Sequence, residues 1–153
     1  MELNKKILDK KVKFCNYRNI EISDDEFAII LITLPAFLVA NSDNEFDEDE
    51  RNLMANLLYN FLYEIYGKEL NEDEYEQMIL AYLEEFLRIN EHTELKNMLM
   101  GGLKLLCTEI EGLAETVKEM IQEVAEVSDG VSQEENDMIE SISNSLDNIE
   151  DFS

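Results

Sequence analysis

The sequence predicts an all-α protein of six to eight helices that form a single compact domain. Apolar residues recur at steps of three and four along most of its 153 residues. No segment alternates apolar and polar residues as a half-buried strand does, and one proline with five glycines leaves few turn signals for a sheet. A hydrophobic content of 45% at this length is sufficient for one buried core.

Residues 1–20 are predicted to form a basic amphipathic helix. The first 18 residues contain six basic side chains against two acidic ones, which is half of all the basic residues in the chain. We expect the apolar stripe of this helix to pack on the core. Its lysines then lie against the acidic remainder or present a patch to a partner. The stripe consists of Leu3, Ile7, Leu8, Val12 and Cys15.

Several helix starts are marked by capping boxes, in which a Ser, Thr, Asp or Asn side chain and a Glu three residues later satisfy free backbone N–H groups. A helix beginning at Asp47 is expected to run to about Tyr66 and to end at Gly67. Thr93 is expected to cap a further long helical stretch. The capping boxes are Ser23 with Glu26, Asp47 with Glu50, Asn71 with Glu74, and Ser132 with Glu135.

Two positions interrupt the helical pattern. Pro35 has no N–H to donate to the Leu31 carbonyl, so it predicts a kink or a break near Leu34. Gly101 and Gly102 lie among apolar helical residues. They either split the helix or allow another helix to approach closely.

A motif of helix, short acidic turn and second helix occurs twice, at residues 39–50 and 124–135. Each copy has Val-Ala at a helix end, then Ser-Asp, an apolar residue, and a capping Asp or Ser with Glu three residues later. Two similar helix pairs commonly pack as halves of one core. We therefore expect a pseudo-two-fold repeat of helix–acidic turn–helix units.

These two motifs resemble the TerB-like family, helical proteins named for tellurite resistance. The first copy, residues 43–50, has Asn44 where the family has Gly and one extra residue before Phe46; the second, residues 129–135, has Gly130. The resemblance implies that residues 21–150 form an acidic TerB-like helical domain, followed by a tail at 151–153. It also implies a link to bacterial stress response or phage defence, with acidic residues that bind a metal.

If the two turns lie side by side, their carboxylates could surround one hard cation, Ca²⁺ or Mg²⁺. A standard EF-hand loop is excluded because Val39 would occupy its first ligand position. The alternative is that these residues only cap helices and tie their turns. The candidate metal ligands are Asp43, Asp47, Glu50, Asp129 and Glu135.

The inventory of reactive side chains argues against an enzyme. His92 is the only histidine, which excludes di-iron sites with two Glu-x-x-His units, and zinc sites built from His and Cys. We expect His92 in an exposed loop before the Thr93 cap. Cys15 and Cys107 are too few for a disulfide framework, and the first residues do not form a signal peptide, so we expect a reduced cytoplasmic protein.

The net charge of −24 disfavours direct binding to nucleic acid or anionic lipid and favours a protein partner with a basic surface. The longest apolar run, residues 27–40, is too short to span a bilayer. We expect a non-enzymatic binding module; the alternative is an acidic inhibitor or DNA mimic that occupies a basic groove. Five tyrosines mark either the edge of the core or a partner surface: Tyr59, Tyr63, Tyr66, Tyr75 and Tyr82.

Overall fold

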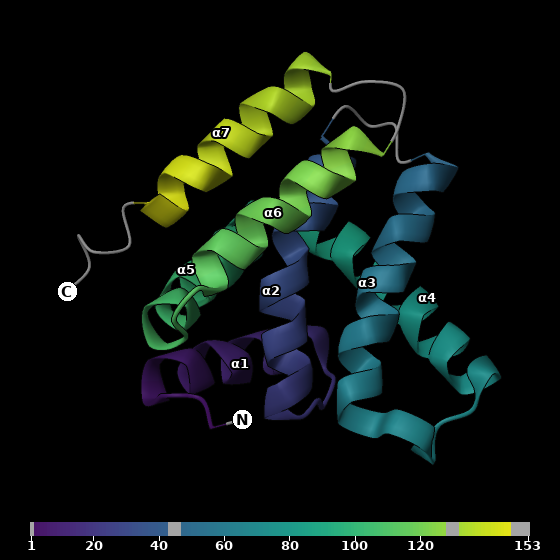
Figure 1. The fold of residues 1–153 in the computed structure, drawn as a ribbon. Helices are drawn as coiled ribbons and strands as arrows, with labels where there is room; N and C mark the ends of the chain where they lie inside the picture. The colour runs from purple at the N-terminus through teal and green to yellow at the C-terminus, as the bar shows by residue number, and fades with distance from the viewer. Residues whose placement is uncertain (1, 43–46, 128–131, 148–153) are drawn as a thin grey trace.

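The computed structural model describes residues 2–42, 47–127 and 132–147, and the described part of the chain is all helical (Figure 1). It forms a single compact domain without strands in these residues, as the sequence predicts. The elements are α1 (Lys5–Arg18), α2 (Asp24–Ala40), α3 (Glu48–Tyr66), the 3-10 helix η1 (Gly67–Glu69), α4 (Glu72–Asn90), α5 (Thr93–Glu109), α6 (Leu113–Glu126) and α7 (Gln133–Asp147).

Helix α2 runs through the centre of the molecule, and the other helices pack around it (Figure 1). Every residue from Phe27 to Ala40 is buried, as expected of a helix that is apolar on all sides. The one polar side chain in this stretch, Thr33, donates its hydroxyl to the Ile29 carbonyl at 2.7 Å. Among the described residues, no helix has the combination of length and apolarity that crossing a bilayer requires.

Helix α2 continues unbroken through Pro35, so of the two predicted outcomes near Leu34, a kink or a break, the break does not occur. Proline removes one backbone hydrogen bond from the helix and crowds the preceding turn. Because neighbouring helices enclose α2 on all sides, burial of its apolar side chains outweighs that loss.

Helix α5 is likewise continuous through Gly101 and Gly102, so this pair does not split the helix. The other interpretation, that the two glycines allow another helix to approach closely, is confirmed. A Cβ atom on Gly102 would lie 3.2 Å from Leu31 Cδ2 and 3.3 Å from Lys10 Cδ. The missing side chains therefore allow α1 and α2 to approach α5 closely. The helical stretch ends later, where Gly112 adopts a positive φ of 82° just before α6.

The predicted capping boxes at Ser23, Asp47 and Asn71 are all present. The prediction of Thr93 as a cap is wrong, because Thr93 is the first residue of α5 and His92 is the cap. The Nδ1 atom of His92 accepts the Leu95 N–H at 3.1 Å, so the imidazole supplies the acceptor that a hydroxyl would otherwise provide. His92 is half-buried, with its ring against Tyr17, rather than exposed in a loop.

Helix α1 packs into the same core through Ile7 and Phe14, whose side chains are fully buried. The prediction that Val12 shares this buried face is wrong, since its side chain is 57% exposed. A helix turns by about 100° per residue, which places Phe14 about 20° from Ile7 but Val12 about 140° away.

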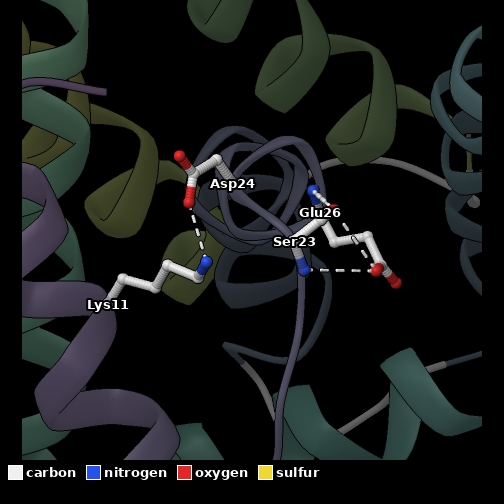
Figure 2. Close-up of polar contacts among 4 residues, drawn as sticks. All are labelled: Lys11, Ser23, Asp24 and Glu26. Atoms are coloured by element: carbon white, nitrogen blue, oxygen red, sulfur yellow. Dashed lines mark hydrogen bonds and ion pairs between the residues drawn. The ribbon is translucent and has the colours of Figure 1, made fainter. Parts of the chain in front are cut away.

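Two basic residues of α1 lie against the acidic remainder of the chain. Lys11 Nζ is 2.7 Å from Asp24 Oδ1, directly beside the Ser23–Glu26 capping box (Figure 2). Arg18 pairs with Glu85 of α4, which is only 9% exposed. These contacts join α1 to the first turn of α2 and to α4.

We predict that α1 is held mainly by its apolar face. Ile7→Ala should lower the free energy of unfolding by about 2–5 kcal/mol, because it leaves a cavity in the core. Val12→Ala should change it by less than about 0.5 kcal/mol. Lys11→Gln should lower it by about 1 kcal/mol or less, because the ion pair of Lys11 with Asp24 is still partly exposed to solvent.

The measurement is urea denaturation followed by circular dichroism at 222 nm. Equal losses in the Ile7 and Val12 variants would contradict the assigned orientation of α1. If Ile7→Ala does not fold, Ile7→Val provides the same comparison with an expected loss of about 0.5–1.5 kcal/mol.

Candidate functional site: the buried glutamates Glu50 and Glu135

Each of the two motifs forms a pair of consecutive helices, α2 with α3 and α6 with α7. Helix α6 packs on both α2 and α3, and α7 packs on α2 and α6. The start of α3 and the end of α6 therefore lie at the same end of the bundle (Figure 1). The closer prediction, that the two pairs superimpose as a pseudo-repeat, stays a prediction.

Glu50 and Glu135 have the same local role. The Glu50 N–H donates to Asp47 Oδ1 at 2.8 Å, and the Glu135 N–H donates to Ser132 Oγ at 3.1 Å. Both glutamates are therefore the third residue of their helices and donate a backbone N–H to the side chain of the capping residue. Their side chains are buried, with exposed fractions of 1% and 2%.

Burial is not a requirement of the capping role. Glu74 of α4 makes an equivalent capping box with Asn71, at 3.1 Å from Oε1 to the Asn71 nitrogen, and its side chain is exposed. The burial of Glu50 and Glu135 thus reflects how the two helix pairs meet and is not a consequence of capping chemistry. This difference makes the pair the strongest candidate for a functional site.

The surroundings of Glu50 disfavour the charged form of its carboxyl group. Burial is the main cause that raises the pKa of Glu50 to about 8. A hydrogen bond from the Asp47 backbone N–H opposes this shift, and the negative charges of Asp47 and Glu135 reinforce it. Its Oε2 atom is buried and has no hydrogen-bond partner among the described residues. Because this pKa lies above 7, the protonated form of Glu50 is favoured at neutral pH.

Of the five predicted metal ligands, the structure places Glu135 close enough to Glu50 for its charge to act on the Glu50 carboxyl group. Asp47 belongs to the same turn, but its side chain is exposed and caps α3. Asp43 and Asp129 lie outside the described residues. Within the described part of the chain, no group of three or more His, Cys, Asp or Glu side chains is arranged to hold a metal ion. The interpretation of these residues as caps alone therefore stays open beside that of a cation site.

The sequence did not indicate which carboxylates are buried. The only available signal was the position of Glu50 and Glu135 just before runs of inward-facing residues, and Glu74 has the same position without being buried. Burial here depends on contacts between segments that are far apart in the chain, which a local pattern does not encode.

The reactive side chains that the sequence singled out lie elsewhere. Cys15 and Cys107 are free and half-buried. Burial, together with the charge of Glu115, raises the pKa of the Cys107 thiol to about 11. This thiol is therefore protonated and weakly nucleophilic at neutral pH.

The five clustered tyrosines divide into two groups. Tyr82 donates its hydroxyl to Glu26 Oε1 at 2.7 Å. The pKa of Tyr66 is raised to about 12, mainly by burial and also by a hydrogen bond to Glu26. These two tyrosines belong to the edge of the core. Tyr59 and Tyr63 are exposed, and they form an aromatic cluster with the buried Tyr75.

No protein-family model matches this chain, and neither do the curated proteins or the solved structures with which it was compared. The resemblance to the TerB-like family therefore rests on the two motifs alone.

We predict that Glu50 makes stability depend on pH. Its pKa is higher in the folded state than the usual value of 4.5, so the folded protein retains a proton that the unfolded chain releases. The free energy of unfolding should therefore fall as pH rises from about 4.5 to about 8. Each unit of pKa difference is worth about 1.4 kcal/mol, so the fall due to Glu50 should reach a few kcal/mol.

Urea denaturation of the wild type and Glu50→Gln at pH 5 and pH 8 measures this contribution. The substitution should remove much of the pH dependence, whereas Glu74→Gln, at the exposed capping box, should leave it unchanged. Parallel profiles for the wild type and Glu50→Gln would show that Glu50 is not the responsible group.

Proposed function

We propose that this protein is a non-enzymatic, cytoplasmic TerB-like binding module. It holds a divalent cation, Ca²⁺ or Mg²⁺, between its two acidic turns and binds a protein partner with a basic surface. The observation that carries the cation site is the buried Glu50 carboxyl, whose Oε2 lacks a hydrogen-bond partner among the described residues and feels the charge of Glu135. A role in bacterial stress response or phage defence follows from the family resemblance.

The helix N-terminus does not control the ionisation of Glu50. A carboxylate at a helix N-terminus is stabilised by about 0.3–1 kcal/mol, which lowers its pKa by less than one unit. The pKa of Glu50 is instead raised to about 8, so burial and neighbouring negative charge outweigh the helix terminus. A divalent cation would offset the charge of both glutamates at once.

Two carboxylates are a sufficient protein contribution for a hard cation. Mg²⁺ commonly keeps several water molecules and binds through one or two carboxylates, and Ca²⁺ also accepts backbone carbonyls. Asp47, at the rim of the pair, offers a third carboxylate without losing its place at the start of α3. Bound there, the cation would join the first turns of α3 and α7.

The charge distribution supports a basic partner. The first turns of α3 and α4 carry exposed acidic side chains, including Glu48, Asp49, Glu72 and Asp73. Together with the net charge of −24, these groups attract a cationic surface and repel phosphate backbones.

We predict that Ca²⁺ or Mg²⁺ raises the melting temperature of the wild-type protein more than NaCl does at the same ionic strength. Binding to the folded state alone adds about 2.7 kcal/mol of stability when the free ion is at 100 times its dissociation constant. Sodium chloride reports the screening of the net charge, which also stabilises the fold.

The divalent increment should disappear in Glu50→Gln and persist in Glu74→Gln. The increment, rather than the absolute melting temperature, is compared because Glu50→Gln also removes a buried carboxyl. Asp43→Asn combined with Asp129→Asn tests the remaining candidate ligands. Equal stabilisation by NaCl, or an unchanged increment in Glu50→Gln, would contradict a cation at this pair.

We also predict that proteins captured from the native host by the immobilised chain are basic and elute as NaCl is raised from 0.15 to 0.5 M, because their attraction is electrostatic. Mass spectrometry identifies them. The alternative of an acidic inhibitor or DNA mimic predicts a DNA-binding protein that duplex DNA displaces. Capture of acidic proteins only, without salt dependence, would contradict both.

A further inference from the structure

A cavity of about 270 Å³ lies between α3 and α4, apart from the acidic turns. Tyr59 is the residue of α3 that lines this cavity. It is nine residues after Glu50, which corresponds to about 13 Å along the helix axis. The cavity is lined by Tyr59, Glu72, Asp73, Tyr75, Glu76 and Ile79.

Aromatic rings form two walls of this cavity. The centroids of Tyr59 and Tyr75 are 5.0 Å apart, and their planes meet at 63°. Tyr63 stacks on Tyr59 at 5.8 Å, and Tyr75 is 3% exposed, with its hydroxyl donated to the Gly67 carbonyl. Burial and this hydrogen bond hold the Tyr75 ring in place, while 37% of Tyr59 remains exposed.

Carboxylates form the rim. Glu72, Asp73 and Glu76 are exposed, and none of them forms an ion pair with another described residue. No basic residue lines the cavity. An aromatic face attracts a cation through its quadrupole, and a carboxylate attracts it through charge. The two features therefore select the same class of ligand.

We propose that this cavity binds an arginine side chain of the basic partner. A guanidinium group is planar, stacks on aromatic rings and pairs with carboxylates through two parallel N–H groups, so it matches both the walls and the rim. This inference rests on the proposed function only in that the occupant belongs to a basic partner. It does not depend on the cation between the acidic turns.

The test uses acetyl-Gly-Arg-Gly-amide, which carries one positive charge, and the same peptide with citrulline, its neutral isostere. Each is titrated into the ¹⁵N-labelled protein in 0.15 M NaCl, and amide shifts are followed by NMR. The arginine peptide should produce saturable shifts at Tyr59, Tyr75 and Glu76, and the citrulline peptide should bind several-fold more weakly.

Tyr59→Leu should weaken binding of the arginine peptide by about three- to fivefold, the size expected for one cation–π contact at an exposed site. Tyr59→Phe should keep most of the affinity, because it retains the ring. Tyr17→Leu is the matched control, since Tyr17 is an exposed tyrosine on α1 that lies outside the cavity lining.

Three outcomes would overturn the proposal. Equal binding of the citrulline and arginine peptides would remove the role of charge. Amide shifts that spread over other acidic faces and that Tyr59→Leu leaves unchanged would show that this cavity is not the binding site. That result would not contradict the proposed basic partner. Absence of saturable shifts with either peptide would also remove the site, and the salt-dependent capture of a basic partner then tests the proposed function separately.

Discussion

The arrangement of the molecule depends on the enclosure of α2. A helix that is apolar on every side cannot lie at a surface, so the other helices must surround it. The same constraint explains why Pro35 is tolerated inside α2, and why Gly102 is required where α5 crosses it. It also positions the candidate site, because α2 ends at Ala40, immediately before the first acidic turn.

The capping boxes show how one local motif acquires different roles from its surroundings. Glu74 caps α4 and remains in water. Glu26 caps α2 and also accepts the Tyr82 hydroxyl, which ties α4 to the start of the central helix. Glu50 and Glu135 cap helices that meet against α2 and α6, so their carboxyl groups are withdrawn from water. In all four, the glutamate N–H donates to the side chain of the capping residue, but the surroundings of the four carboxyl groups differ.

Local chemistry could be predicted from the sequence because it depends on neighbouring residues. The caps at Ser23, Asp47 and Asn71 and the central helix follow from side-chain type and apolar patterning. The His92 cap was missed because histidine rarely has this role. The orientation of Val12 was missed because several apolar residues of α1 compete for one face, and the heptad from Ile7 to Phe14 determines which face is buried.

The candidate site was predicted only in part for a related reason. The side-by-side arrangement of the two acidic turns was one of two alternatives that the sequence left open, and it stays a prediction. In the described residues, Glu135 lies close enough to Glu50 for its charge to act on it. The burial of these two glutamates, and the walls that Tyr59 and Tyr75 form, arise from packing between separate helices and have no signature in either motif alone. The tyrosine positions were visible as a cluster, but the division between core edge and surface was not.

Helix α3 carries both sites on opposite faces. The nine residues between Glu50 and Tyr59 correspond to about two and a half turns, so the two side chains point in opposite directions from the helix axis. The charge of Glu135, on α7, acts on Glu50, and the ring of Tyr59 contacts that of Tyr75 on α4. Residues more than about 7–10 Å apart that share no contacts have nearly additive effects on stability. A substitution at one site should therefore leave the stability contribution of the other intact, which allows the proposed cation and arginine sites to be tested independently in one protein.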